Sequence, residues 1–377
     1  MSRNSYLFII GIISLLGFGC DEPKSSTAID ASWEWEGFTK ADEVNPILSP
    51  SDQLKFKCPI SGQSVNWEQR NVLNPSAVVK DGKVYLLYRA QDETGTSRIG
   101  MAVSEDGLNF EKMESPVFYP DNDGMKNYEW HHAKDKDLEK GKDYFDGVED
   151  PRVVGMPGGG FLMTYTAYDG KTARLCFATS EDLFSWDKKG LVLKDEKYKD
   201  TWSKAGAIVS SLQESQVTAA SVGGKYWMYY GDTDFFMATS EDLLSWTPLE
   251  NAENGRRISV LHPRSGYFDS RLVEPGAYAL LLPEGIHMIY NASNAVNFND
   301  SELPVFTYAP GQVLFNAKKP NQVIERSDNY LFRPDKNYER EGEVNEVCFV
   351  EGLVYFREKW FLYYGTADSH IAVAVKG

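Results

Sequence analysis

The sequence predicts an all-β protein and, more closely, a five-bladed β-propeller. The first observation is a repeat, because Ser-Glu-Asp occurs three times in the same setting, starting at Ser104, Ser180 and Ser240. The second is that each copy follows a short run of aromatic and apolar residues. The third is that no long stretch shows the 3.6-residue period of an amphipathic helix. A unit that recurs at this length is typical of propellers and solenoids.

Five strand-like runs extend the repeat along the chain. They cover residues 85–89, 161–166, 226–231, 286–291 and 360–365. Aromatic and β-branched residues dominate these runs, and such side chains fit a pleated, half-buried surface. Turn signals rich in glycine precede most of the runs, and the intervals leave room for a four-stranded sheet around each one. Each run carries an aligned tyrosine that we expect to pack in the core, namely Tyr88, Tyr165, Tyr230, Tyr290 and Tyr364.

The Ser-Glu-Asp segments themselves are interpreted as structural turns. Their Ser and Asp side chains can bond nearby backbone groups, and an aromatic residue four positions after the Asp can pack beneath the sheet. We therefore expect no chemistry at these positions.

The N-terminus has the features of a targeting segment. Residues 1–20 contain a weak basic start and a short apolar stretch, and Leu16-Gly-Phe-Gly-Cys20 resembles the lipobox of bacterial lipoproteins. Residues 1–20 are thus predicted to be a lipoprotein signal peptide with Cys20 as the lipidated residue, residues 21–40 a tether, and residues 41–377 the propeller. The expected location is the cell envelope of a Gram-negative bacterium, facing the periplasm or the cell surface. An ordinary secretory signal is the alternative.

Composition restricts the partners. The net charge of −16 disfavours nucleic acid and anionic membrane surfaces, so membrane contact is expected only through the lipid anchor.

Cys58, Cys176 and Cys348 lack metal-ligand spacing and are expected to be buried thiols. There is no nucleotide-binding glycine loop and no nucleophilic serine elbow. We expect no cofactor and no metal, and an aromatic-rich acidic surface suits neutral polar ligands such as sugars.

Polar residues interrupt the apolar runs at places that a propeller would bring to its axis. Asn74 opens the first predicted sheet, and Glu149-Asp150-Pro-Arg152 opens the second. The other candidates follow or precede further strands, and they are Arg89, Asp92, Arg98, Glu274 and Asp368.

These residues carry a resemblance. The segments Asn74-Pro-Ser, Val84-Tyr-Leu-Leu-Tyr-Arg89, Gly147-Val-Glu-Asp-Pro-Arg152 and Tyr363-Tyr-Gly-Thr-Ala-Asp368, together with Asn45-Pro-Ile-Leu-Ser-Pro50, resemble glycoside hydrolase family 130. The resemblance spans about residues 43–374. It implies a five-bladed propeller that cleaves β-mannosides, by phosphorolysis in most members and by hydrolysis in some.

The resemblance also implies roles for individual residues. Asp150 matches the proton donor, which acts through a sugar hydroxyl. Arg152 is expected to orient Asp150 and to bind the same sugar, unless Arg152 only forms an ion pair with Glu149. Asn74, Arg89, Arg98 and Asp368 match positions that hold the mannose, and Asp92, after the same strand as Arg89, is assigned to substrate binding with them.

Charge separates hydrolysis from phosphorolysis. A phosphorylase needs cations to hold phosphate, whereas an inverting hydrolase needs a second carboxylate about 6.5–9.5 Å from the first. Glu214 and Glu274 open the third and fourth predicted sheets, and the resemblance implies that a phosphorylase would have a cationic pocket there. We therefore predict an inverting hydrolase of β-mannosides, β-1,2-linked by the resemblance, with Asp150 as acid and Glu214 or Glu274 as base.

Three alternatives remain open at this point. Lys204 and Arg271 are the residues that could bind phosphate in a β-mannoside phosphorylase. A catalytically inactive, surface glycan-binding lipoprotein is an alternative of another class. A different five-bladed glycosidase family, such as the arabinan-type enzymes, is disfavoured because Gly-Val-Glu-Asp-Pro-Arg is not among its motifs.

Overall fold

The computed structural model describes residues 33–377, except 132–133, 135–142, 297–299 and 302, and in these residues the chain is all-β as predicted. The helices of the described part are two single turns, α1 (Lys126–Glu129) and α2 (Asn337–Arg340). Among the same residues, no helix has both the length and the apolar character that crossing a bilayer requires.

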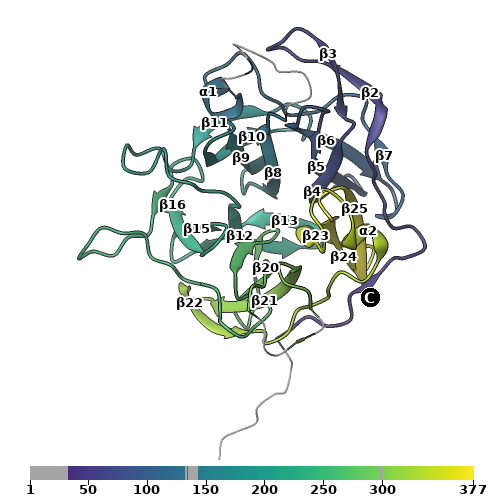
Figure 1. Ribbon diagram of the computed structural model, residues 1–377. Coiled ribbons are helices and arrows are strands. Elements are labelled where there is room, and N and C mark those ends of the chain that lie inside the picture. The colour runs from purple at the N-terminus through teal and green to yellow at the C-terminus, as the bar shows by residue number, and fades with distance from the viewer. Residues whose placement is uncertain (1–32, 132–133, 135–142, 297–299, 302) are drawn as a thin grey trace, which may run out of the picture. The chain divides into compact units, whose positions relative to one another are not determined.

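Antiparallel pairing groups most strands of the described chain into five successive sheets (Figure 1). The first sheet contains β4 (Asn71–Lys80), β5 (Lys83–Gln91), β6 (Thr96–Ser104) and β7 (Glu111–Lys112). The second contains β8 (Asp146–Gly155), β9 (Phe161–Tyr168), β10 (Ala173–Ser180) and β11 (Asp187–Leu191). The third contains β12 (Ala207–Gln213), β13 (Gln216–Ala219), β14 (Ser221–Val222), β15 (Lys225–Tyr230), β16 (Phe236–Ser240) and β17 (Thr247–Pro248).

The remaining two sheets follow the same order along the chain. The fourth contains β18 (Leu272–Pro275), β19 (Ala279–Leu281), β20 (Ile286–Ser293), β21 (Tyr308–Asn316) and β22 (Lys319–Arg326). The fifth contains β23 (Cys348–Phe356), β24 (Lys359–Thr366), β25 (His370–Lys376) and the early strand β1 (Thr39–Lys40). A separate hairpin is formed by β2 (Ser51–Lys57) and β3 (Ser64–Glu68).

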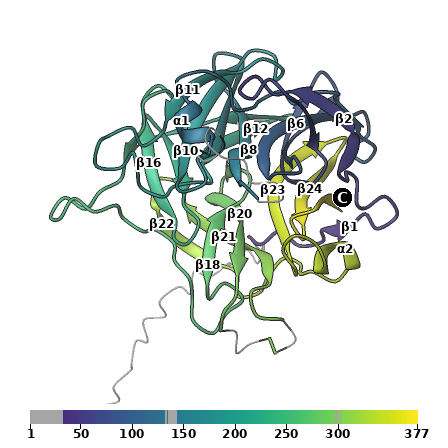
Figure 2. The same cartoon turned by 45° about the horizontal axis from the view of Figure 1, so that its top comes forward.

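Short parallel pairings join neighbouring sheets near the middle of the unit. β6 pairs with β8, β13 with β8, and β12 with β19. Strands β4, β8, β12 and β23 lie near the centre of the ribbon view in Figure 1, and Figure 2 shows the same unit turned by 45°. The starts and ends of these strands are therefore the places from which side chains far apart in the sequence can meet.

The N-terminal end of the folded unit lies earlier than the sequence predicted. β1 pairs with β25, and the ring of Trp35 packs between His287 and Trp360 at centroid distances of 4.7 and 4.6 Å. Residues 33–40 are therefore part of the folded unit, because both contacts fix them to the fourth and fifth sheets. The predicted signal peptide, Cys20 and the tether up to residue 32 lie outside the described residues.

The Ser-Glu-Asp segments are structural turns, as predicted. In each copy the Asp carboxylate accepts two backbone N–H groups that follow it, as at Asp182, where Phe184 and Ser185 donate at 2.8 Å. Asp106 and Asp242 repeat the pattern. These bonds hold the turn between the last two strands in each of the first three sheets. Cys58, Cys176 and Cys348 are free thiols and buried, which confirms that prediction as well.

The five aligned tyrosines are core residues, with at most 1% of each side chain exposed. Four of them also donate a hydrogen bond to a buried carboxylate, which was not foreseen. Tyr165, for example, donates to Glu129, and Lys188 on the outer strand β11 pairs with the same carboxylate. The other three sets are Tyr88–Glu68–Lys112, Tyr290–Asp269–Arg326 and Tyr364–Glu339–Lys40. In each set a buried charge connects the middle of a sheet to its outer strand.

Candidate active site

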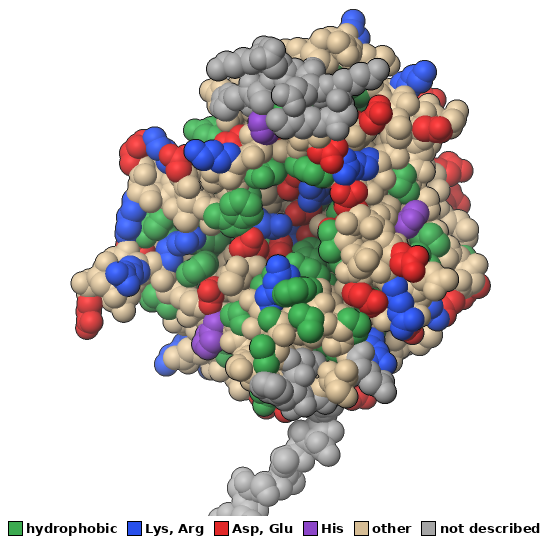
Figure 3. Space-filling model, in the orientation of Figure 1, with side chains coloured by type: hydrophobic (Ala, Val, Ile, Leu, Met, Phe, Trp, Pro, Cys, Tyr) green, Lys and Arg blue, Asp and Glu red, His purple; other side chains and the backbone are tan. Residues whose placement is uncertain are grey.

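A cavity of about 140 Å³ lies where the inner strands converge. Figure 3 shows this hollow in the middle of one face, with acidic and basic side chains inside it. Its lining comprises Asn74, Arg89, Asp150, Lys204, Glu274, Tyr308, Val344, Val347, Phe349 and Asp368. A larger groove of about 630 Å³ runs beside β11, but none of the predicted site residues line it.

The backbone is distorted where the first two site residues enter the cavity. Asn74 and Asp150 both precede a proline inside a strand, and both have positive φ values, of 48° and 51°. The ladder shifts register at each position, between Leu73 and Pro75 and after Glu149. Such bulges turn a side chain away from the pleat and cluster at functional sites. The result is that Asn74 Nδ2 donates to Asp150 Oδ1 at 2.9 Å.

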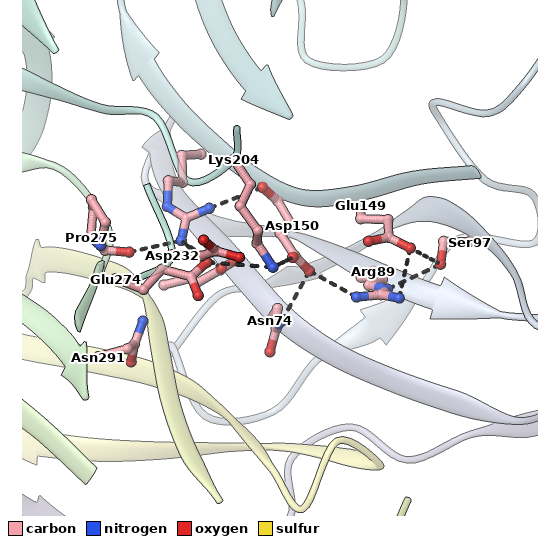
Figure 4. Close-up of polar contacts among 12 residues, drawn as sticks. Asn74, Arg89, Ser97, Glu149, Asp150, Lys204, Asp232, Glu274, Pro275 and Asn291 are labelled. Atoms are coloured by element: carbon pink, nitrogen blue, oxygen red, sulfur yellow. Dashed lines mark hydrogen bonds and ion pairs between the residues drawn. The ribbon is translucent and has the colours of Figure 1, made fainter. Parts of the chain in front are cut away.

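Asp150 is buried among positive charges (Figure 4). Arg89 Nη1 donates to Asp150 Oδ1 at 3.3 Å, and Lys204 Nζ lies 3.4 Å from Oδ2. Burial alone would raise the pKa of Asp150, but Lys204, Arg89 and the Asn74 hydrogen bond hold it well below its usual range. Asp150 Oδ2 accepts no hydrogen bond from the described residues, so it is available to a ligand in the cavity.

Arg89 links Asp150 to the second sheet. Its Nη2 donates to Glu149 Oε1 at 2.7 Å and its Nε to Ser97 Oγ at 3.0 Å. Ser97 in turn donates to the same Glu149 oxygen at 3.2 Å. Burial raises the pKa of Glu149, although the charge of Arg89 opposes this. The contacts on both sides of Arg89 hold its guanidinium at the wall of the cavity.

Arg152 does not pair with Glu149, which corrects that alternative. Its Nη2 lies 2.8 Å from Glu351 Oε1 and 3.8 Å from Glu274 Oε1, and it donates to the Pro275 carbonyl at 2.8 Å. Its Nη1 donates to the carbonyl oxygen of Asp150 at 3.3 Å. Arg152 therefore ties β8 to β18 and β23 beneath the cavity, behind Asp150.

Glu274 lies beside Asp150 at the start of the fourth sheet, and only 4% of it is exposed. Lys204 Nζ lies 3.6 Å from its Oε1, so one ammonium group stands between two carboxylates. Burial raises the pKa of Glu274 to about 7 even though Lys204 and Arg152 lower it. Its Oε1 accepts no hydrogen bond from the described residues. A carboxyl group with this pKa can exchange protons near neutral pH.

Glu351 completes the cluster and was missed in the sequence. It lies in the apolar strand β23 at a register shift between Val350 and Gly352, and its side chain is fully buried. Burial holds its pKa well above the usual range. A lone acidic residue before a glycine in an apolar run was the signal that could have identified it.

The carboxylates of the site approach one another closely. One oxygen from each of Asp150, Glu274 and Glu351 lies within 4.8 Å of the other two. The two carboxyl groups of an inverting pair that acts directly on the glycosidic oxygen are about 6.5–9.5 Å apart. The nearest oxygens of Asp150 and Glu274 are therefore closer than the gap that we expected to separate these residues. Arg152 and Lys204 already supply two positive charges to these three groups, so the donor set does not require a metal ion.

Asp368 and Asp232 add further acidic groups at the edges. Asp368 lines the cavity in the turn between β24 and β25, and burial raises its pKa to about 6 despite the charge of Arg89. Asp232, which the sequence did not single out, accepts a hydrogen bond from Trp202 Nε1 at 2.6 Å. Its charge acts on both Lys204 and Glu274.

Three predicted residues lie outside this cluster. Glu214 is exposed in the turn between β12 and β13, with a positive φ of 56°, so it does not face Asp150. Asp92 and Arg98 are buried and pair with each other at 2.8 Å, and neither lines the cavity. The geometry therefore supports neither Glu214 as the base nor Asp92 and Arg98 as substrate contacts, because all three residues lie outside the lining of the cavity.

Carboxylates outnumber cations in the cluster. The acidic members are Glu149, Asp150, Asp232, Glu274, Glu351 and Asp368, and the basic members are Arg89, Arg152 and Lys204. Every one of these three cations already contacts at least one carboxylate. Arg271 differs, because it is exposed and contacts the Ser293 and Tyr308 hydroxyls at 3.4 Å.

Comparison with known proteins adds independent information. Residues 38–377 match the model of glycoside hydrolase family 130, which is described as beta-1,4-mannooligosaccharide phosphorylase. The 1,2-beta-oligomannan phosphorylase of Thermoanaerobacter sp. (strain X514) is 30% identical over 320 residues, which cover 82% of this chain and 90% of that protein.

Two solved structures are similar over almost the whole chain. A glycosyl hydrolase from Bacteroides ovatus is 39% identical, with a TM-score of 0.84 over 91% of this chain and 94% of that one. A second structure is 38% identical, with a TM-score of 0.85 over 92% and 95% of the two chains. It is described with glycoside hydrolases of the mannoside phosphorylase family that target beta-1,2 mannosidic linkages in Candida mannan.

Proposed function

The chain belongs to glycoside hydrolase family 130, and from this premise we propose that it hydrolyses β-1,2-mannosidic linkages in oligosaccharides or mannan. Membership makes it an enzyme of glycosidase type that acts on β-mannosides, by hydrolysis or by phosphorolysis. The linkage is inferred from two relatives whose descriptions name β-1,2-mannosides. We also propose that the five sheets are the blades of a propeller with the cavity at its axis.

The observation that carries the proposal is the excess of carboxylates around Asp150. A phosphate dianion would need cations that are free to bind it. Arg89, Arg152 and Lys204 are all engaged with acidic groups, so phosphate would compete with Glu149, Glu274 and their neighbours for each of them. Water needs no such counter-charge, and it needs a base, which a carboxylate provides.

Asp150 and Glu274 are the groups that we assign to proton transfer. The resemblance gives Asp150 the role of proton donor through a sugar hydroxyl, and Glu274 has the pKa of a group that can accept a proton from water near neutral pH. Because their nearest oxygens are within 4.8 Å, one water or one sugar hydroxyl can bridge them. This short gap suits a relay through the substrate, whereas an inverting pair that acts directly on the bond would need more room.

The protonation states follow from the two opposite pKa shifts. Asp150 is ionised in the empty site, whereas Glu274 titrates near pH 7. Between these values the pair holds one proton, mostly on Glu274. The state in which Asp150 carries the proton and Glu274 is ionised has the same total charge, so it is a minor form of the same singly protonated pair.

The size of the cavity limits what can enter it. Ligand pockets for larger molecules are about 300–1,000 Å³, whereas this cavity is about 140 Å³. We infer that it holds a single sugar ring, with Asn74, Arg89 and Asp368 around it, and that the enzyme releases terminal mannose units one at a time.

Phosphorolysis is the second candidate, and Arg271 favours it as an exposed cation beside Tyr308 at the edge of the cavity. The test is to incubate the enzyme with β-1,2-mannobiose with and without inorganic phosphate and to identify the products. Free mannose without phosphate supports hydrolysis. Mannose 1-phosphate that forms only with phosphate would establish a phosphorylase, and binding without turnover would indicate the inactive glycan-binding protein.

The anchoring of the protein is a separate proposal from the N-terminal sequence. We propose that Cys20 is lipidated and holds the enzyme in the envelope of a Gram-negative bacterium. Expression of Cys20→Ala in such a host, followed by separation of membrane and soluble fractions, tests it. Movement of the variant to the soluble fraction is expected, and an unchanged distribution would contradict the proposal.

A further inference from the structure

Large apolar side chains that are exposed gather around the mouth of the cavity. Val344 lines the cavity itself, and Val305 and Phe306 lie three and two residues before Tyr308, which also lines it. Trp202 lies two residues before Lys204, another lining residue. Exposed apolar groups that cluster rather than scatter mark binding surfaces. The mouth of the cavity is therefore built to contact a ligand that extends out of it.

Two contacts hold the side chain of Trp202, although 48% of it is exposed. Its Nε1 donates to Asp232 Oδ2 at 2.6 Å, and the ring of Tyr168 meets its ring at a centroid distance of 6.2 Å and an angle of 67°. The hydrogen bond fixes the polar edge of the indole. One contact from the end of β9 and one from the third sheet thus hold an aromatic ring in place beside solvent.

Asp232, the acceptor of this hydrogen bond, connects Trp202 to the groups proposed for proton transfer. The charge of Asp232 acts on Lys204 and on Glu274, so the indole is attached to the same acidic group that influences the proposed base. A tryptophan ring offers a broad apolar face, and the C–H groups on one face of a pyranose ring can pack flat against it. An exposed tryptophan that is fixed through its polar edge keeps that face available to such a ring.

The position of Trp202 indicates which sugar it would contact. It does not line the cavity, which has room for one ring, so the sugar that stacks on it is the next one along the chain. If the cleaved mannose occupies the cavity, this next sugar is on the leaving-group side of the bond. We propose that Trp202 is the platform for the leaving-group sugar and that it gives the enzyme its preference for oligosaccharides over simple mannosides.

This inference rests on the proposed function for the direction of cleavage, but its test measures binding alone. The Asp150→Asn variant, in which turnover should be blocked, is titrated calorimetrically with mannose, β-1,2-mannobiose and β-1,2-mannotriose. Trp202→Ala is then added to the same background. The affinity for the disaccharide and trisaccharide should fall about tenfold, as expected for the loss of one well-packed aromatic contact. The affinity for mannose should change less than twofold.

Two further variants control the measurement. Trp202→Phe keeps an aromatic face without the Nε1–H, so it should retain most of the disaccharide affinity. Phe184→Ala removes another exposed aromatic ring, which lines the groove beside β11 and not this cavity, and should change none of the affinities. Circular dichroism and thermal melting of each variant check that it is folded.

The outcomes separate the two proposals. An equal loss of affinity for mannose and mannobiose would overturn the platform, because Trp202 would then act on the cavity itself. No loss for any ligand from a folded Trp202→Ala variant would overturn it as well. A selective loss would support it even if the enzyme proved to be a phosphorylase, since the binding of β-mannosides does not depend on the attacking molecule.

Discussion

Activity is expected to fall above about pH 7, because the Asp150–Glu274 pair must keep one proton to donate to the leaving group. The pKa of Glu274 is about 7 and that of Asp150 is far lower, so the upper limit of the singly protonated state is set by the titration of Glu274. This holds whichever of the two carboxyl groups carries the proton in the reacting complex, since both forms have the same net charge.

The size of the effect follows from this pKa. One pH unit above it, about one-tenth of the enzyme keeps the proton, and two units above it about one-hundredth does. The value of kcat/KM for β-1,2-mannobiose should therefore fall about tenfold per pH unit between pH 8 and pH 9.5. The assay is release of mannose at low substrate concentration in buffers of constant ionic strength, with the stability of the enzyme checked at each pH.

Variants identify the residue whose titration causes the fall in kcat/KM above pH 7, the alkaline limb of the pH profile. Glu274→Gln cannot exchange a proton, so the rate should fall by about 10²–10⁴-fold and the limb near pH 7 should disappear from what remains. Glu214→Gln is the matched control, because this exposed glutamate in the turn after β12 should change neither the rate nor the profile.

Two results would refute the reasoning. Activity that rises through pH 7 and stays constant above it would mean that Glu274 acts only as a base and that the proton comes from another group. If the Glu274→Gln variant kept the full rate and the same pH dependence, Glu274 would take no part in proton transfer.

The remaining predictions concern the attacking molecule and the framework. The rate of mannose release from β-1,2-mannobiose should change by no more than about twofold between zero and 10 mM phosphate. A strict requirement for phosphate would show that the paired cations can still bind phosphate. Lys188→Met leaves the buried carboxylate of Glu129 without its cation and should lower the free energy of unfolding in urea by about 3–5 kcal/mol at pH 8. Burial already raises the pKa of Glu129 to about 7, so protonation should reduce this loss at pH 5, whereas the exposed neighbour change Lys189→Met should cost little at either pH. Trp35→Ala should cost about 2 kcal/mol of stability, seen as a lower Tm, while kcat at 25 °C is retained; an equal loss of kcat would mean that this contact also shapes the cavity.

Local patterns predicted the elements and part of the site. The aromatic runs identified the middle strands because their residues face both a neighbouring sheet and the core. Asn74 and Asp150 stood out because they are polar residues that interrupt apolar runs. Both residues then prove to lie in bulges that bring them within 2.9 Å of each other.

Other site features depend on tertiary placement, which the spacing of residues does not encode. Glu214 and Glu274 were both candidates for the base, yet Glu214 is in an exposed hairpin turn and Glu274 is buried in β18. Arg98 follows the first aromatic run closely, but its guanidinium pairs with Asp92 and does not line the cavity. The distance between Asp150 and Glu274 depends on how neighbouring sheets pack, so the expected wide gap could not be tested by counting residues.

Pairing β1 with β25 has a consequence for how the protein can be produced and handled. The last sheet contains the first strand of the folded unit, so it cannot be completed until the ribosome has released nearly the whole polypeptide. A shortened version that starts at Ala41, the boundary that the sequence suggested, would leave the end of β25 around Ala374 and Val375 with an open hydrogen-bonding edge. Such an edge invites association between copies. For expression, keeping residues 33–40 is therefore expected to decide between soluble monomers and aggregates.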